Sequence, residues 1–280
     1  MRKIIAAFAL FATFTLSAQS PKSSEFQGRV KSVEEHSFKA KQSKGVISRG
    51  KRAREYSTDY DFKMEYDSIG RPSKRTWISM KGNIIKVLYY TYDSTGLLVN
   101  EKSEDGDNNP LFTFTYHREF NASGKLTTMM VSASTVSKST VYHYTYDDKN
   151  NQFESRQTGE GNQILNLETR TFNAKSQITR QYIYNANNTL WGYEEYNYDE
   201  EGNCIQKTLY NDKKEIIIIY RWKYEDKKIL LRYEVCGNTG MNCETWIYRY
   251  EYDQTGNWIQ RIEFRNGKLM FVKEREIIYW

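Results

Sequence analysis

The chain has 280 residues, with 41 basic and 35 acidic side chains and a formal net charge of +6. This excess is too small for a nucleic-acid binder, which carries a concentrated basic footprint. Aromatic residues make up 15% of the chain, including 23 tyrosines, whereas there are only 3 prolines. This composition favours β-strands paired on both sides, because rings suit a pleated surface and proline removes a ladder hydrogen bond.

Residues 1–18 have the pattern of an export signal. A basic start at Arg2 and Lys3 precedes an apolar run that ends at Leu16, and Ala18 completes a small-residue cleavage site. The run is shorter than the roughly 20 apolar residues of a transmembrane helix. No later stretch approaches that length, so we expect an exported mature chain, periplasmic or secreted, without a transmembrane anchor.

A five-residue motif returns eight times at a near-constant spacing. An aromatic residue is followed by Asp, Asn or Glu, then by two variable residues and usually by Gly. The copies begin at Tyr66, Tyr92, Phe120, Tyr146, Phe172, Tyr198, Tyr224 and Tyr252, mostly 26 and twice 28 residues apart. Such a period is the signature of a repeat architecture, in which one supersecondary unit stacks on copies of itself.

The motif predicts a tight turn in every unit. The side chain of Asp or Asn can bond the backbone two residues on, and Gly at the fourth turn position supplies a positive φ. This is a standard hairpin connection with a bulge. The predicted turn residues are Asp67, Gly70, Asp93, Gly96, Asn121, Gly124, Asp147, Asp199, Gly202, Asp253 and Gly256. Asn150 tolerates the Gly position, whereas Ser176 and Lys228 suit it poorly, so we expect those two turns to be distorted.

A second aromatic position lies two residues before the turn aromatic. It is occupied by Tyr90, Tyr144, Tyr196, Trp222 and Tyr250. Because residues i and i+2 share one face of a strand, these rings form a row. The row is a candidate stacking platform for sugars. A packed internal ladder is the favoured interpretation, since exposed rings of this area promote aggregation.

A polar segment midway between turns divides each unit into two strands. The sequence therefore predicts an all-β fold, a repetitive antiparallel meander of about 16–18 strands in one curled or spiral sheet with its aromatic face inside. The 28-residue units are longer by an even number, which keeps this face, because a one-residue slip would invert every side chain.

The repeat also sets the expected domain limits. Residues 19–60 should form an N-terminal strand and a basic loop that caps the array, and residues 61–280 the repeat domain. Seven basic residues and no acid lie between Lys39 and Arg54. They are candidates for contact with anionic envelope polymers, and a solvated loop is the favoured interpretation.

The recurrent YDxxG, with Y-x-Y before it and an apolar residue after it, resembles the YD repeat of the RHS family. YDSTGLL, YDEEGNCI and YDQTGNWI match best, and the resemblance covers roughly residues 60–262. It implies a β-rich wrapping sheet, exported or surface-exposed, sometimes associated with carbohydrate binding. The largest members enclose a C-terminal toxin. In this chain the Arg that follows Gly in the family's repeat is present only at Arg71. We therefore expect a short exported member of the family without a toxin domain.

The sequence offers no catalytic constellation. His36, His117 and His143 are the only histidines, and none stands at a spacing typical of a metal ligand or a triad, which favours ordinary strand positions. The prominent aspartates are explained by turn chemistry, whereas a glycosidase needs two carboxylates that converge at about 5–9.5 Å. We therefore expect no catalytic residue, no metal and no cofactor.

The three cysteines leave one thiol unpaired. Cys236 and Cys243 bracket the longest mid-unit loop and should face each other across a hairpin, where a disulfide is plausible in an oxidising compartment. Cys204 should remain a buried thiol at an apolar position.

The leading functional hypothesis is a non-enzymatic exported binding or scaffolding module, in the cell envelope or outside the cell, whose partner is an envelope protein or a polysaccharide. The alternative is an outer-membrane β-barrel, which shares the signal and the final aromatic Trp280. Against it, the alternate residues Ile278, Glu276 and Glu274 would place charge in lipid. A secreted carbohydrate-active enzyme is a third hypothesis, without a motif to support it. The sequence leaves the oligomeric state open.

Overall fold

The computed structural model describes residues 26–54, 60–135, 139–149, 151–159, 161, 163–225 and 229–280. The export signal, Asn150 and Lys228 lie outside these ranges. The described residues form nineteen β-strands: β1 (Val30–Ser43), β2 (Val46–Arg52), β3 (Asp61–Tyr66), β4 (Pro72–Ile78), β5 (Ile84–Tyr92), β6 (Leu98–Asp105), β7 (Pro110–Phe120), β8 (Leu126–Ala133), β9 (Thr140–Asp147), β10 (Gln152–Thr158), β11 (Ile164–Phe172), β12 (Ile178–Tyr184), β13 (Leu190–Tyr198), β14 (Cys204–Asn211), β15 (Ile216–Glu225), β16 (Ile229–Gly237), β17 (Glu244–Tyr252), β18 (Trp258–Arg265) and β19 (Lys268–Tyr279).

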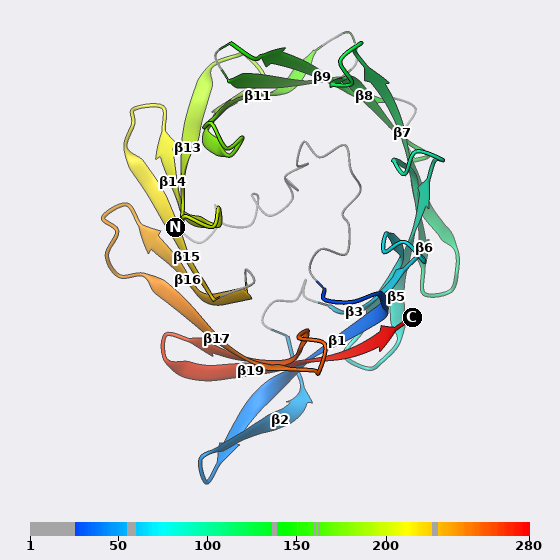
Figure 1. Cartoon of the computed structure of the whole chain (residues 1–280), viewed down its shortest axis with the longest axis vertical. Coiled ribbons are helices and arrows are strands. Elements are labelled where there is room, and N and C mark those ends of the chain that lie inside the picture. The colour runs from blue at the N-terminus through cyan, green and yellow to red at the C-terminus, as the bar shows by residue number, and fades with distance from the viewer. Residues whose placement is uncertain are drawn as a thin grey trace.

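The strands form one closed antiparallel ring (Figure 1). From β3 to β19 each strand pairs with the next one along the chain. β1 pairs with β19 along Val30–Lys39 and with β3 along Ser32–Glu35, which joins the two ends of the meander. All nineteen strands except β2 therefore make an 18-strand barrel. The predicted all-β meander is confirmed, and it closes instead of forming a spiral.

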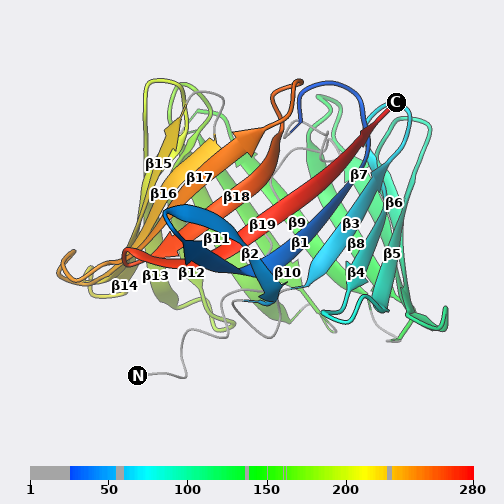
Figure 2. The ribbon, with the colours of Figure 1, turned by 90° about the horizontal axis from the view of Figure 1, so that it is seen from below.

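Closure follows from the geometry of a long antiparallel sheet. Twist accumulates from strand to strand, so a wide sheet curls, and closing it removes the unpaired edges that would otherwise recruit other chains. The strands run obliquely to the barrel axis, as a closed barrel requires (Figure 2).

The basic segment forms an ordered β-hairpin in place of the expected loop. β1 continues beyond its pairing with β19, and β2 pairs back on it from Phe38–Arg52 to Ser43–Val46. Lys44 and Gly45 form the turn, with φ values of 50° and 82°. Two consecutive positive φ values are typical of a two-residue type I′ turn, whose twist matches that of the strands. The hairpin projects outward from the ring (Figures 1 and 2).

The repeated turns have the geometry that their sequence predicts. At Asp93 the side-chain Oδ1 accepts hydrogen bonds from the amides of Thr95 and Leu97, both at 2.9 Å. The amide of Gly96, at φ 89°, donates to the carbonyl of Asp93 at 3.1 Å. The same main-chain bond, with a positive φ at Gly, occurs at Gly70, Gly124, Gly202 and Gly256.

The predicted distortion of the Ser176 turn is wrong. Ser176 adopts φ 59° and donates to the Asn173 carbonyl at 2.9 Å, as Gly does elsewhere. The Asn173 side chain accepts from the amides of Lys175 and Gln177 and donates to the Gln177 side chain at 2.8 Å. These extra bonds hold the turn in shape although Ser is strained at positive φ.

The hairpin identifies which face of the sheet points outward. β2 lies outside the ring, and from it Arg49 contacts Glu274 on β19 while Arg52 contacts Asp61 on β3. Side chains that share the face of Glu274 and Asp61 therefore point out. The opposite face, which includes the aromatic row, points into the barrel, as the sequence predicts.

The cysteines have the expected pairing. Cys236, at the end of β16, and Cys243, just before β17, form a disulfide with a Cα–Cα distance of 4.1 Å. Cys204 is a free thiol, as predicted, but it is half-buried where the sequence predicts a buried thiol. Burial raises the pKa of this thiol, so it remains protonated and weakly reactive at neutral pH.

Candidate functional site: the aromatic lumen

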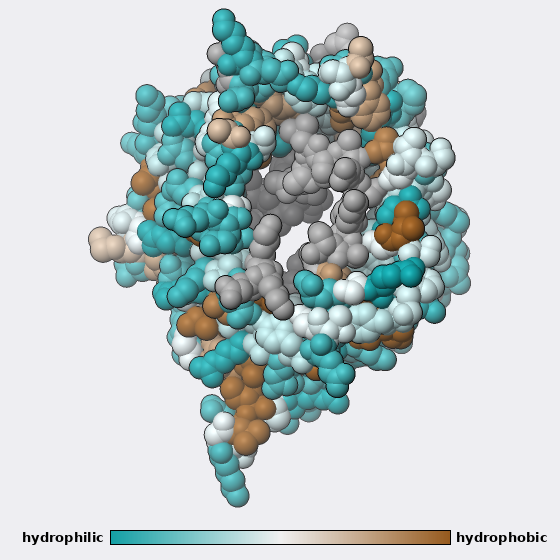
Figure 3. Space-filling view, in the orientation of Figure 1, coloured by the Kyte–Doolittle hydropathy of each residue, from teal (hydrophilic) through white to brown (hydrophobic). Residues whose placement is uncertain are grey.

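The barrel is wide enough to enclose a lumen. Eighteen strands spaced about 4.8 Å apart and tilted by about 40° give a ring roughly 35 Å across between backbones. Barrels of this size are too wide for side chains alone to fill. The space-filling view down the ring shows an opening between the walls (Figure 3).

The five rings named from the sequence line this lumen. Tyr90, Tyr144, Tyr196, Trp222 and Tyr250 occupy the same place in five units and are all half-buried. They are therefore intermediate between the two interpretations of the sequence. Each ring packs partly against its neighbours and leaves part of its surface facing the interior.

The residue opposite each ring occupies a fixed place in the repeat, five positions after the turn Gly. Glu101 faces Tyr90, Lys207 faces Tyr196 and Arg261 faces Tyr250. These charged residues were not predicted from the sequence, because no aromatic or apolar pattern marks the fifth position after the turn Gly. Their inward orientation could have been predicted, because a hairpin register counted from the turn pairs the fifth residue after the turn Gly with the ring two residues before the turn aromatic.

The inner rings on β15–β18 form two groups of packed rings, one across β15, β16 and β17 and the other across β17 and β18, which we together call the aromatic wall. Its members are Tyr220, Trp222, Tyr233, Trp246, Tyr248, Tyr250 and Trp258. The centroids of Trp222 and Tyr233 are 5.8 Å apart, those of Tyr233 and Trp246 5.2 Å, and those of Tyr250 and Trp258 5.9 Å. Pairs at these separations each add about 0.5–1.5 kcal/mol beyond area burial. The wall is therefore a stiff apolar surface.

A charged network borders the aromatic wall. Glu263, only 4% exposed, pairs with Arg261 at 2.6 Å and lies 3.7 Å from Lys273. Arg275 pairs with Glu35 at 2.8 Å, and its guanidinium lies 3.6 Å from the centre of the Trp258 ring. Buried charges are tolerated when they are paired in this way. The network places hydrogen-bonding groups beside flat aromatic faces.

Two further polar clusters lie on the same inner face. Burial raises the pKa of the Glu101 carboxyl, although the Tyr116 hydroxyl, which donates to it, and the Lys86 charge act in the opposite direction. Burial, together with the charge of Glu101, also raises the pKa of Tyr90 to about 12. The phenol is thus neutral at physiological pH and available as donor or acceptor.

The second cluster joins β13 and β14. Lys207 pairs with Glu194 at 2.8 Å, and the hydroxyl of Tyr196 donates to the same carboxylate. Burial and the neighbouring Glu194 raise the pKa of Tyr196 far above its ordinary value. Like the network beside the wall, this cluster combines a ring with an ion pair.

The turn aromatics have a structural role at the rim. The hydroxyl of Tyr92 donates to the carbonyl of Pro72 at 2.7 Å, and that of Tyr198 to Ile178 at 2.8 Å. Each bond links one repeat to the preceding one, which satisfies a carbonyl at the end of a strand.

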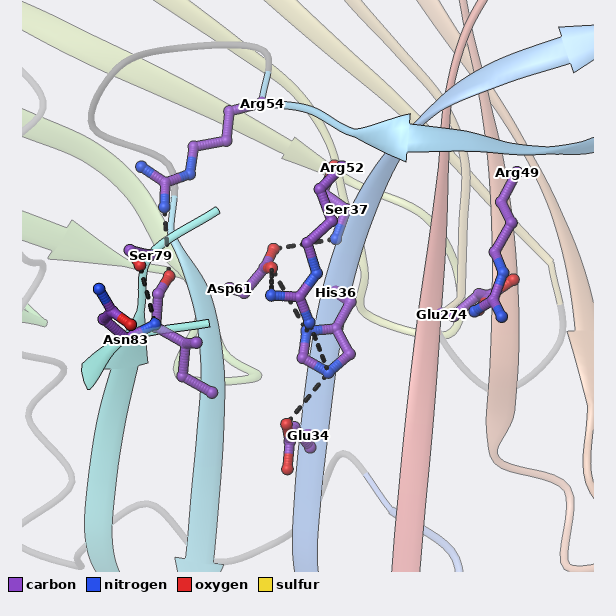
Figure 4. A network of polar contacts seen from close by, with 11 residues as sticks. Glu34, His36, Ser37, Arg49, Arg52, Arg54, Asp61, Ser79, Asn83 and Glu274 are labelled. Carbon is purple, nitrogen blue, oxygen red and sulfur yellow. Dashed lines mark hydrogen bonds and ion pairs between the residues drawn. The ribbon is translucent and has the colours of Figure 1, made fainter. Parts of the chain in front are cut away.

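His36 has partners that the sequence did not reveal (Figure 4). On the outer face its Nδ1 lies 3.3 Å from Asp61 and its Nε2 3.0 Å from Glu34. Arg52 of the hairpin contacts both His36 and Asp61, and Ser37 contributes its backbone amide to Asp61. Through Arg52, these contacts tie the hairpin to β1 and β3.

Among the described residues, no group of three or more His, Cys, Asp or Glu side chains is placed to hold a metal ion. No helix in the described ranges is long and apolar enough to cross a membrane.

Comparisons with known proteins give only distant likenesses. No protein-family model matches the sequence, and no curated protein matches it either. A porin-like protein from Bacteroides uniformis is similar in structure, with 10% identity over 90% of this chain and 98% of that one and a TM-score of 0.38. A porin-like protein from Bacteroides vulgatus has 12% identity, the same coverage and a TM-score of 0.36. The TcdB2-TccC3 structure has 11% identity over 84% of this chain but 16% of that one, with a TM-score of 0.33. These likenesses are too weak to assign a function, and the class of protein rests on its own geometry: an antiparallel β-barrel of eighteen strands with an aromatic lumen.

Proposed function

We propose that this protein is an exported, non-enzymatic binding module whose lumen holds a glycan chain. The observation that carries the proposal is the aromatic wall with paired charges at its border. Flat rings cover the apolar faces of a sugar, while carboxylates, guanidinium groups and phenols bond its hydroxyls. The YD-type repeat, which resembles the RHS family, supports the same class of ligand.

The inner carboxylates favour binding over hydrolysis. Glu263, Glu194 and Glu168 each form an ion pair with a neighbouring cation, so each carboxylate already has a partner within the wall of the barrel. Glu101 has a raised pKa, but its direct neighbours across both strand pairs are aromatic, Tyr90 and Phe114. A glycosidase needs a second carboxylate close by.

The second candidate is an outer-membrane β-barrel. The closed ring of eighteen strands agrees with that architecture, and outward residues such as Leu165, Ile217 and Ile247 are exposed. A bilayer requires an outward apolar band about 25 Å tall, and a lipid-facing Arg or Lys costs about 2–4 kcal/mol at its midplane.

The charged side chains of the outer face favour contact with water over contact with lipid. It carries ion pairs along several strands, among them Lys102–Glu104, Arg156–Glu154 and Arg232–Glu234. These pairs support the proposal that the outer surface of the barrel contacts water, in the envelope or outside the cell.

A glycan-binding assay tests the proposal. Mature protein should retain an oligosaccharide on a glycan array, and Trp222→Ala or Tyr250→Ala should weaken that binding about tenfold, since each removes a stacking surface. Tyr182→Ala is the matched control, because Tyr182 is an aromatic strand residue on the outer face. Equal loss in the control, or no glycan retained by the wild-type protein, would overturn the assignment of the lumen as the binding site.

A further inference from the structure

The β1–β2 hairpin is a separate feature that the lumen does not explain. It projects from the barrel wall (Figures 1 and 2) and has no acidic residue from Lys39 to Arg54. Its tight Lys44-Gly45 turn and its cross-strand pairs hold it in a defined shape. A projecting ordered hairpin with one sign of charge has the form of a docking element.

Four of its seven basic residues turn back toward the barrel. Arg49 pairs with Glu274, Arg52 with Asp61, and the Arg54 guanidinium donates to the Ile78 carbonyl at 3.2 Å (Figure 4). The Lys39 ammonium lies 5.0 Å from the centre of the Phe271 ring. These contacts hold the base of the hairpin against the barrel, so these four cations already have partners within the protein.

The remaining three, Lys41, Lys44 and Lys51, are exposed. Within the described ranges, none of them forms an ion pair with an acidic side chain or lies over an aromatic ring. Next to them at the tip, the side chain of Val46 is 67% exposed, the third-highest value among the large apolar residues of the described chain. The tip thus combines unpaired cations with an apolar contact point.

We propose that this hairpin docks the protein on a bilayer surface that carries anionic phosphate headgroups. Lysines near such a surface are attracted by its negative potential. The exposed Val46 favours lipid over a soluble polyanion, because an apolar group gains free energy only where it can leave water. Docking is peripheral, since the hairpin alone enters the headgroup region.

The experiment is co-sedimentation of the full mature chain with vesicles. Wild-type protein should bind vesicles of phosphatidylglycerol and phosphatidylcholine, and should not bind phosphatidylcholine alone. The triple variant Lys41→Gln, Lys44→Gln, Lys51→Gln should bind about 100-fold more weakly, since each lysine near an anionic surface contributes about a fivefold change. Binding should also weaken steeply with salt.

The control variant removes three exposed lysines elsewhere: Lys149→Gln, Lys175→Gln and Lys213→Gln. Its net charge equals that of the test variant, so unchanged vesicle binding would assign the effect to the hairpin. Equal weakening in both variants would overturn the proposal, because net charge alone would then explain attraction.

A Val46→Ser variant separates lipid from a soluble polyanion. Weaker vesicle binding by this variant supports docking on lipid. If Val46→Ser has no effect, and dextran sulfate binds wild type but not the triple variant, the hairpin recognises an acidic polymer and the lipid proposal is wrong.

Discussion

At the scale of single residues, each repeat depends on the Asp or Asn of its turn, whose side-chain oxygen accepts hydrogen bonds from backbone amides. Asp or Asn accepts two amides, and a residue at positive φ closes the turn, as at Asp199, where Oδ1 accepts from Asn203 at 2.7 Å. This much was readable from the sequence, because both requirements are local. The intact Ser176 turn was not, because it depends on the Gln177 side chain.

Substitution of the closing residue tests the turn assignment. Gly202 has φ 87°. The variant Gly202→Val should have an unfolding free energy about 1–3 kcal/mol lower than wild type, because a β-branched residue is strained at this φ. Ser176→Gly should show the opposite sign, with a gain of up to about 1 kcal/mol. Urea denaturation measures both. Equal stability of Gly202→Val and wild type would refute the turn geometry.

The turn carboxylates should make stability depend on pH. A hydrogen bond from the Thr95 side chain and backbone amides lower the pKa of Asp93, and bonds from Asn203 lower that of Asp199 despite some desolvation. The unfolded pKa is about 3.9, so the contribution is complete above that pH and is lost as pH falls through the lower folded pKa. Unfolding free energy measured from pH 5 to 2 should fall less steeply in Asp93→Asn and Asp199→Asn. An unchanged slope would exclude these carboxylates as its source.

At the scale of strands and hairpins, the aromatic period correctly assigned the inner face. The aromatic period did not predict the inward residues of the strand that follows each turn. On that strand the fifth residue after the turn Gly, such as Glu101 or Arg261, points inward opposite a ring. Arg261 pairs with Glu263 two residues further along the same strand, whereas Glu101 on β6 accepts a hydrogen bond from the Tyr116 hydroxyl on β7.

The Cys236–Cys243 disulfide should stabilise the longest mid-unit hairpin. Closing a loop of about eight residues contributes roughly 2.5 kcal/mol in the chain-entropy model. The double variant Cys236→Ala, Cys243→Ala should lose stability of that order in urea, whereas Cys204→Ala should change it less. Thiol titration of denatured, non-reduced protein should find one free group, and three free groups would contradict the pairing.

At the scale of the whole molecule, closure depends on residues far apart in the chain. Asn257, 4% exposed, accepts from the Gln27 amide at 2.7 Å and donates to the Gln27 carbonyl and the Tyr279 hydroxyl. It joins the residues just before β1 to the turn between β17 and β18, as β1 joins β3 and β19. The repeat predicted a curled sheet but could not distinguish a spiral from a ring, since that depends on twist summed over all strands.

Removing the Asn257 side chain, which we call the clamp, should specifically weaken the closure of the barrel at β1 and β19. Asn257→Ala should cost about 2–4 kcal/mol, because it removes buried hydrogen bonds and leaves their partners unsatisfied. Asn203 holds the equivalent place in another turn, where its side chain bonds Asp199, and Asn203→Ala should cost less than about 1 kcal/mol. Hydrogen exchange should show faster opening of β1 and β19 in Asn257→Ala alone. Equal effects of the two substitutions would argue against a clamp.

The most direct test of the central claim is small-angle X-ray scattering of the mature protein in buffer without detergent. A barrel whose outer face meets water should give monodisperse particles with the scattering of a hollow cylinder, and high salt should release any protein found on membranes. Aggregation that only detergent reverses, with protein that stays in the membrane pellet after alkaline extraction, would contradict an aqueous outer face and support a barrel embedded in lipid.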